Sequence, residues 1–219
     1  MKDNSLTKVN KMNNLMLEYA NDIVKVEKQT IINFFDEQKI PYMESYIDFL
    51  SKFGGNQSKF FQTYEFDCTF QEIKDIYLEN AVYDPVPPNG YCIIANQIVE
   101  DWFMIENSTG KIFNSGDLYD ENGKSLDAKL AFKTIDDFLW MQLFATYQNE
   151  FVIDYSSNRY SDIDNYISTF LKGYELLSLP YLNNITYYLK DKKLYFYQQG
   201  EYEIHIHTFK DEFYEQLYL

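Results

Sequence analysis

The stretch IPYMESYIDFLSKFGG, from Ile40 to Gly55, decides the fold of the first half of this chain. Its proline, Pro41, suits the first turn of a helix, because the N–H group that proline lacks would have no partner there. The apolar residues that follow recur at helical spacing and form one face. They are Tyr42, Tyr46, Phe49, Leu50 and Phe53. Gly54 and Gly55 can adopt the left-handed conformation that ends a helix, so the stretch predicts an amphipathic helix with one buried face.

Helical patterns also surround this stretch. Apolar residues recur at three- and four-residue steps between Leu15 and Asp36, which predicts one long helix or two shorter ones. Further helix starts are indicated where a serine or threonine is followed three residues later by an acid, the pattern of a capping box. These pairs are Thr69 with Glu72, Thr134 with Asp137, and Ser161 with Asp164. A helix is expected to begin just after the first residue of each pair.

Strand-like runs occupy much of the rest of the chain, because apolar or alternating residues are typical of strands. The runs are Phe60–Phe66, Tyr91–Ala95, Ile98–Glu106, Lys111–Phe113, Ile185–Leu189, Leu194–Gln198 and Glu201–Thr208. Short turns, NSTG at Asn107–Gly110 and KDKK at Lys190–Lys193, join neighbouring runs into hairpins. Since no βαβ unit repeats, the predicted fold class is α+β, a mainly antiparallel sheet flanked by helices, with a C-terminal extension of helix and strands.

The composition restricts the kinds of partner. The chain has 34 acids and 19 bases among its 219 residues, a formal net charge of −15. This charge disfavours nucleic acids and anionic membranes, which attract cations, and favours fast association with a basic protein. Cys68 and Cys92 have neither disulfide nor zinc spacing, and neither a signal peptide nor a membrane span is predicted, so we expect a cytoplasmic protein. The 21 tyrosines suit contact surfaces, although a compositional bias explains them equally well.

The histidines of the last predicted strand are the clearest candidates for chemistry. Because residues alternate between the faces of a strand, His205 and His207 are expected to share its polar face with Glu203. Two such histidines could bind a metal with a third ligand, but the chain has only these 2 histidines, and we predict no metal site.

Catalytic motifs are not recognisable in the sequence. Adjacent acids such as Asp136 and Asp137 would serve glycoside hydrolysis only as a spaced pair in a cleft, and Asp137 already has a role in helix capping. Neither a nucleophile motif nor a phosphate-binding glycine loop is apparent. The chain is therefore predicted not to be an enzyme and to need no cofactor.

Several segments, taken in their order, resemble the SUKH superfamily, which includes fungal regulators of cell-wall synthesis, the bacterial Syd protein and many bacterial immunity proteins. Ile40–Gly55 is similar to the family's leucine-proline helix with a glycine-rich end, although isoleucine stands where leucine is usual. The strand–turn–strand Asp101–Phe113 resembles its hairpin, and Ala131–Leu143 resembles its closing helix with a "DFL" segment. Ile31–Gln38 fits the family's first helix.

The resemblance covers roughly residues 23–144 and predicts the domain organisation. Residues 15–149 are expected to form a SUKH-like core after a frayed N-terminus, residues 1–14. Residues 150–219 have no counterpart in the short members and are expected to extend the same domain.

The resemblance implies a non-enzymatic binding protein. Bacterial members typically neutralise a cognate toxin, often a nuclease, and a nuclease has a basic surface that this acidic chain would complement. A general scaffold or regulatory binder is the alternative, and the oligomeric state is left open. Candidate partner-binding residues are acids and aromatics beside the hairpin and on the last strand. They are Glu100, Asp101, Trp102, Asp117, Tyr119, Asp120, Glu121, Glu201, Glu203 and His205.

Overall fold

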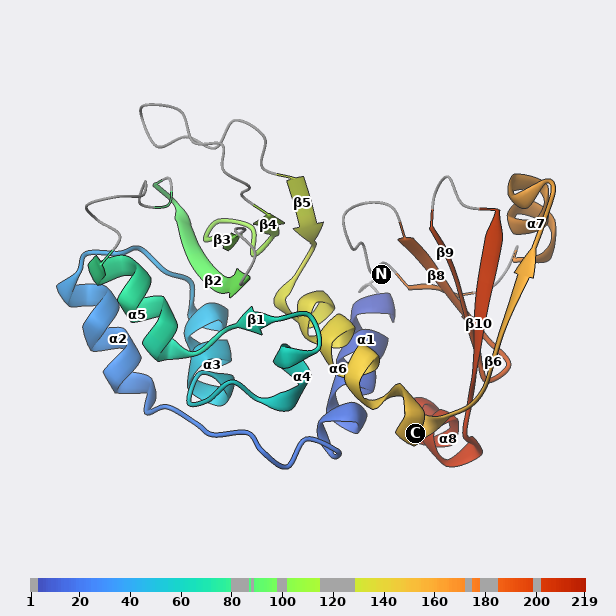
Figure 1. Cartoon of the computed structure of the whole chain (residues 1–219), viewed down its shortest axis with the longest axis horizontal. Helices are drawn as coiled ribbons and strands as arrows, with labels where there is room; N and C mark the ends of the chain where they lie inside the picture. The colour runs from blue at the N-terminus through green and yellow to red at the C-terminus, as the bar shows by residue number, and fades with distance from the viewer. Residues whose placement is uncertain are drawn as a thin grey trace. The chain divides into compact units, whose positions relative to one another are not determined.

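The computed structural model describes most of the chain as two compact units (Figure 1). The described residues are 4–79, 87, 89–97, 102–114, 129–171, 175–177, 185–198 and 202–219. The central unit is Ala20–Phe138, and the terminal unit combines Met1–Tyr19 with Leu139–Leu219, so both ends of the chain belong to it. The chain thus divides at Phe138 and Leu139, whereas the sequence predicted a core to residue 149 and an extension from residue 150.

The fold class is confirmed as α+β with antiparallel sheets. In the described part of the central unit the strands form one sheet in the order β1-β2-β3-β4-β5, and each neighbouring pair is antiparallel. The strands are β1 Phe66–Asp67, β2 Tyr91–Gln97, β3 Trp102–Glu106, β4 Ile112–Asn114 and β5 Lys129–Phe132. The helices are α2 Lys28–Glu37, α3 Glu44–Phe53, α4 Lys59–Gln62 and α5 Phe70–Glu79. The strand predicted at Phe60–Phe66 is wrong, because the segment begins in α4 and continues as a turn, and β1 begins only at Phe66.

Helix α3 confirms the amphipathic helix predicted from the stretch Ile40–Gly55. Its buried residues are Tyr46, Ile47, Phe49, Leu50 and Phe53. Pro41 lies before the helix, and its carbonyl oxygen accepts hydrogen bonds from the Cys92 thiol at 2.8 Å and the Asn107 side-chain amide at 2.7 Å. The proline therefore holds the approach to α3 against the sheet, and it does not form the first turn.

The glycines after α3 permit close packing, and the predicted left-handed backbone is wrong. Gly54 has a φ of −81°, which any residue can adopt. A Cβ atom at Gly54 would lie 2.6 Å from the Leu50 carbonyl oxygen, and one at Gly55 would lie 2.5 Å from the Val24 carbonyl oxygen. The amide of Phe70 also donates to the Gly54 carbonyl at 2.8 Å. The two glycines thus let neighbouring segments approach more closely than any side chain would allow.

The predicted hairpin is confirmed by β3 and β4. Its turn is closed by the Gly110 amide, which donates to the Glu106 carbonyl at 2.8 Å. Gly110 has a φ of +73°, a conformation that favours glycine. The positive φ of the turn therefore explains why the T-G turn of the sequence has glycine at Gly110.

Phe138 joins the segments of the central unit into one core. It lies in the first turn of α6, Ile135–Phe151, and its ring centroid is 6.2 Å from that of Phe49 in α3 and 6.5 Å from that of Phe103 in β3. Rings of Phe61 and Phe132 lie 6.1 Å and 5.3 Å away. All these side chains are buried, so the "DFL" segment supplies the aromatic centre of the unit.

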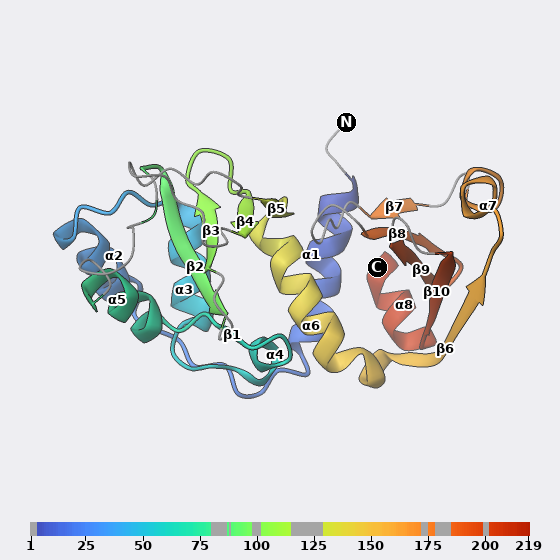
Figure 2. The ribbon, with the colours of Figure 1, turned by 45° about the horizontal axis from the view of Figure 1, so that its top comes forward.

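The terminal unit packs helices on a second antiparallel sheet, and Figure 2 shows α1, α6 and α8 on one side of it. Among the described residues the strand order is β6-β10-β9-β8-β7. The strands are β6 Val152–Arg159, β7 Glu175–Leu177, β8 Ile185–Lys190, β9 Lys193–Gln198 and β10 Glu203–Phe209. The helices besides α6 are α1 Asn4–Leu17, α7 Ile163–Phe170 and α8 Asp211–Tyr218. The β8–β9 hairpin confirms the predicted KDKK turn.

Helix α1 replaces the frayed N-terminus expected for residues 1–14. Val9, Met12 and Met16 recur at helical spacing and are fully buried. The sequence pattern was too polar overall to reveal them, because asparagine and lysine fill most positions between these apolar residues. The apolar stripe packs within the terminal unit, where α1 contacts α8 and β7.

The predicted helix caps are largely confirmed. In the first two pairs the threonine hydroxyl accepts the expected amide hydrogen bond: Thr69 from Glu72 at 3.2 Å and Thr134 from Asp137 at 3.1 Å. The third prediction is wrong by one residue, because Asp162 and not Ser161 caps α7. The Asp162 carboxylate accepts from the Asn165 amide at 3.0 Å, and a carboxylate also favours the positive end of the helix dipole.

Candidate functional site

Most of the predicted partner-binding residues lie outside the described residues. These are Glu100, Asp101, Asp117, Tyr119, Asp120, Glu121 and Glu201. Of the others, Trp102 begins β3 in the central unit, where it is half-buried and opposite Asn96. Glu203 and His205 belong to β10 in the terminal unit. The two described groups are therefore in different units.

His205 belongs to an aromatic row across the terminal sheet. Its ring stacks on Phe196 of β9 with centroids 4.7 Å apart, and its Nδ1 atom shares a hydrogen bond with the Tyr155 hydroxyl at 2.6 Å. Tyr155 lies on β6 and is 54% exposed. Such cross-strand pairs stabilise a sheet, so the structural role of His205 is clear, while its Tyr155 partner remains accessible at the surface.

His207 is buried, so the prediction that both histidines lie on a polar face is wrong. It is 6% exposed, and its ring lies against Phe144 of α6 at 5.2 Å and Tyr155 at 5.0 Å between centroids. Burial lowers the pKa of His207 from 6.5 to about 4, and the neighbouring His205 contributes to this shift. The sequence alternation marked His207 as a polar position, but the helices on this face of the sheet bury it. Neutral His207 is consequently part of the packing at physiological pH.

The opposite face of the terminal sheet carries half-exposed tyrosines that the sequence analysis did not single out. Tyr188 of β8 lies directly opposite Tyr195 of β9, and Tyr195 lies opposite Ile206 of β10. Tyr197 shares this face, two residues from Tyr195 along the strand. The alternation of tyrosine in Leu194–Gln198 could have indicated this surface. We call Tyr188, Tyr195, Tyr197 and Ile206 the tyrosine face.

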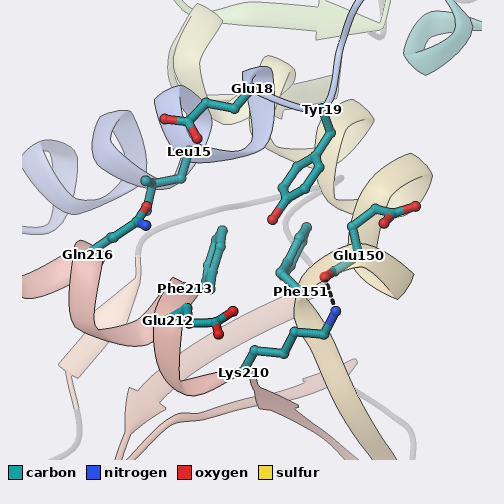
Figure 3. A pocket seen from close by; sticks show the side chains of 9 residues that line it. All are labelled: Leu15, Glu18, Tyr19, Glu150, Phe151, Lys210, Glu212, Phe213 and Gln216. Atoms are coloured by element: carbon teal, nitrogen blue, oxygen red, sulfur yellow. Dashed lines mark hydrogen bonds between the residues drawn. The ribbon is translucent and has the colours of Figure 1, made fainter.

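A pocket of about 310 Å³ lies between α1, the end of α6 and α8, all within the terminal unit. Figure 3 shows its lining side chains, with Tyr19 pointing its hydroxyl toward two phenylalanine rings. The lining residues are Leu15, Glu18, Tyr19, Glu150, Phe151, Lys210, Glu212, Phe213 and Gln216. We call this the terminal pocket. Its residues come from both ends of the chain, which is why sequence patterns did not reveal it.

The walls of the terminal pocket are aromatic. Phe151 and Phe213 are buried and stack with centroids 4.4 Å apart and ring planes inclined by 15°. Tyr19, 39% exposed, lies 6.3 Å from Phe151 and covers the pair from α1. Only Tyr19 of these three rings is exposed, so the two phenylalanines form packed core beneath the pocket.

The rim of the terminal pocket is acidic. Glu18, Glu150 and Glu212 are exposed, and in the described part of the chain no ion pair neutralises them. The pKa of the Tyr19 hydroxyl is raised first by burial and then by these same three carboxylates. The one lysine of the lining, Lys210, donates its ammonium hydrogen bond to the Glu150 backbone carbonyl. The pocket therefore keeps an excess of negative charge.

The two cysteines are unsuited to nucleophilic chemistry. Burial raises the pKa of the Cys92 thiol to about 11 and raises that of Cys68 well above its usual value. A thiol with such a pKa is protonated at neutral pH and unreactive. Among the described residues, no group of three His, Cys, Asp or Glu side chains converges as a metal site.

Comparison with known proteins gives no assignment. No family model, curated protein or solved structure matches this chain. A search of the described residues for a helix of the length and apolar character needed to cross a membrane finds none.

Proposed function

We propose that this chain is a cytoplasmic immunity protein of the SUKH superfamily. In this proposal it binds a basic bacterial toxin, such as a nuclease, and covers the toxin's active surface. Inhibition is steric and electrostatic, and the chain itself carries out no reaction. The proposal joins the family resemblance of the sequence to the charge and surfaces of the molecule.

The observation that carries the proposal is the meeting of the motif segments at Phe138. The helix, the hairpin and the "DFL" segment resemble the family separately, and their rings contact one another through Phe49, Phe103 and Phe138. The resemblance implies that these segments pack together in one scaffold. Their common packing therefore supports the proposal.

The charge of the chain supports a basic partner. A formal net charge of −15 attracts a basic surface over a distance of about 10 Å at 0.1 M salt. Attraction of this kind mainly accelerates association, whereas buried aromatic anchors slow dissociation. The half-exposed tyrosines of the tyrosine face are candidates for such anchors.

Co-expression with a candidate toxin gene from the neighbourhood of the gene for this chain tests the proposal. Growth of cells that make both proteins, together with a purified complex, is the expected result. Association should be about ten-fold slower or more when sodium chloride rises from about 20 to about 300 mM. A matched co-expression with an unrelated acidic protein controls for charge alone.

The outcomes separate immunity from a scaffold. Cells that die despite a stable complex would indicate binding without neutralisation, which fits a general scaffold of the same fold. Cell death with no complex contradicts the proposal altogether. Growth rescue with association independent of salt retains an inhibitor but removes the electrostatic mechanism.

A further inference from the structure

We propose that the edge of strand β6 pairs with the same strand of a second copy of this chain, which joins the two terminal sheets into one. Strand β6 is the border strand of its sheet, as Figure 1 shows. Among the described residues, no other backbone segment hydrogen-bonds to its outer side. The inference concerns self-association and does not rest on the proposed function.

The border strand β6 is both long and exposed. It has 8 residues, whereas the other border strands of the two described sheets, β1, β5 and β7, have 2, 4 and 3. Every residue from Ile153 to Arg159 is exposed, although the strand pairs with β10. Proteins often protect an edge with a short strand, a proline or a lysine, and β6 contains neither proline nor lysine. The strand is therefore suited to receive another strand.

The backbone groups on the outer side of β6 follow from its pairing with β10. The Tyr160 amide donates to the Tyr202 carbonyl at 2.7 Å, so Tyr160 has a hydrogen-bonded position in the ladder. Such positions alternate along an antiparallel pair of strands. The amides and carbonyls of Tyr155, Ser157 and Arg159 therefore point away from β10, toward a possible second strand.

Two-fold symmetry selects one register for the pair of β6 strands. In a symmetric antiparallel pair, one residue lies opposite its own copy. With Ser157 at that centre, Tyr155 lies opposite Arg159 of the second copy, so all three outward-pointing residues take part in about six backbone hydrogen bonds. A centre one residue earlier would place Arg159 opposite Ile153, which the register with β10 skips. A centre one residue later would place Tyr155 opposite a residue beyond the end of the strand.

The side chains that this register brings together are complementary. On one face, the guanidinium of Arg159, the one arginine of the chain, would lie beside the Tyr155 ring of the other copy. That ring is 54% exposed, and a cation close to it is attracted by its π-electrons. On the other face, Ser156 would lie opposite Asn158, and these two side chains can hydrogen-bond to each other. Symmetry makes each of these contacts occur twice.

The charge of the chain gives this pairing its own salt dependence. Two copies with a net charge of −15 each repel one another, but β6 itself is neutral, because its charged residues are Asp154 and Arg159. Dimerisation should therefore become stronger as salt screens the repulsion, whereas association with a basic toxin should become weaker. The two proposals thus predict opposite effects of salt.

Sedimentation velocity of the whole protein tests the pairing without a toxin. At about 300 mM sodium chloride, the natural protein should change from mainly monomer to mainly dimer between about 1 and about 200 µM, as expected for a small interface. At about 20 mM sodium chloride, the concentration at the midpoint should be about ten-fold higher. A protein that stays monomeric over this whole range would overturn the proposal.

Variants at the centre of the register test whether β6 is the interface. Ser157→Pro removes the central outward amide and leaves the hydrogen bonds to β10 in place, so it should weaken dimerisation about ten-fold or more. Ser157→Lys should do the same, because it sets two lysines directly opposite each other. Ser156→Lys is the matched control, since it adds the same charge at a residue that does not face its own copy, and it should still dimerise. Equal dimerisation of the two lysine variants would contradict the register, and circular dichroism confirms that each variant is folded.

A disulfide cross-link tests the register in a way that depends little on affinity. Opposite residues of a hydrogen-bonded pair have Cα atoms about 5.5 Å apart, which is within disulfide range, so Ser157→Cys should form a covalent dimer under mild oxidation. Asp154→Cys is the control, because its two copies would be roughly 20 Å apart along the strands. The natural Cys68 and Cys92 are buried and should not react. Cross-linking of neither variant, or of both to the same extent, would rule out the pairing.

Discussion

Replacing His207 should make the terminal unit resistant to mild acid. The imidazole is enclosed by the rings of Phe144, Tyr155 and Phe196, and its Nδ1 atom has no hydrogen-bond partner in the described structure. Protonation in the folded state would place a charge in this aromatic surrounding. The folded pKa of His207 is about 4, against 6.5 for an exposed histidine.

The magnitude follows from the two pKa values. A folded pKa below the unfolded one means that the unfolded chain binds the proton first, so stability is present above pH 6.5 and is lost as the pH falls toward 4. Between about pH 7.5 and about pH 5 the loss is about 2 kcal/mol from this group. The variant His207→Phe keeps a ring in place and removes the titrating nitrogen, so it should lack this loss.

Tryptophan fluorescence can follow the unfolding of the terminal unit by itself. The 2 tryptophans of the chain are Trp102 and Trp140, and Trp140 stacks on Phe144 at 4.7 Å in the terminal unit. In a Trp102→Phe background, urea unfolding followed by Trp140 reports on the unit that contains His207. The measured quantity is the change in unfolding free energy between the two pH values.

The predicted quantity is a difference between two pH values, so the overall stability of the variant does not affect it. His205→Phe provides the matched control: burial is the larger cause of the lowered pKa of His207, so this variant should retain most of the acid sensitivity and lose only the smaller part that His205 contributes. A second variant, His207→Leu, should behave as His207→Phe does. An unchanged acid loss in both His207 variants would falsify the assigned burial of a neutral imidazole.

Further predictions concern the central unit and the hairpin. Burial raises the folded pKa of Asp137 from 3.8 to about 6, so its contribution to stability is present at low pH and is lost as the pH rises through 6. Between about pH 5 and about pH 7.5, the unfolding free energy of Asp137→Asn should therefore rise by about 1 kcal/mol relative to that of the natural protein, as measured by urea unfolding. The absence of this rise would contradict the burial of Asp137. Gly54→Ala should lower the unfolding free energy by about 1–3 kcal/mol, because its Cβ atom would meet the Leu50 carbonyl oxygen at 2.6 Å, and unchanged stability would refute the close approach. Glu100→Gln with Asp101→Asn, both outside the described residues, should slow association with the toxin several-fold at low salt in stopped-flow measurements; an equal effect at high salt would contradict steering.

The central unit was largely predictable because its signals are local. The apolar spacing of α3, the glycine turn of the hairpin and the hydroxyl of Thr134 each act within a few residues. The reasons for Pro41 and Gly54 were not predictable, because they depend on segments far along the chain. The Pro41 carbonyl accepts hydrogen bonds from Cys92 on a strand and from Asn107 in a turn. At Gly54 a side chain would crowd the backbone of Phe70.

The terminal unit was less predictable because its faces are set by packing. Alternation assigned His205 and His207 to one side of β10 correctly, but polarity alone could not show that α6 covers that side. The strand β6 and the helix α8 carry mixed polar and apolar residues with weak periodicity, and neither was predicted. The terminal pocket depends on α8 and on α1, neither of which was predicted, and on the end of α6, so sequence patterns alone could not have indicated it.

The joining of both chain ends in the terminal unit has a consequence for synthesis on the ribosome. Helix α1 is made before the central unit, whereas its packing partner α8 is made after it. The central unit is complete in sequence at Phe138. It can therefore fold while Val9, Met12 and Met16 of α1 are still unburied. Exposed apolar residues of this kind are what chaperones bind. Helix α1 is thus made early and fully buried late, and premature termination before α8 leaves part of its apolar face exposed.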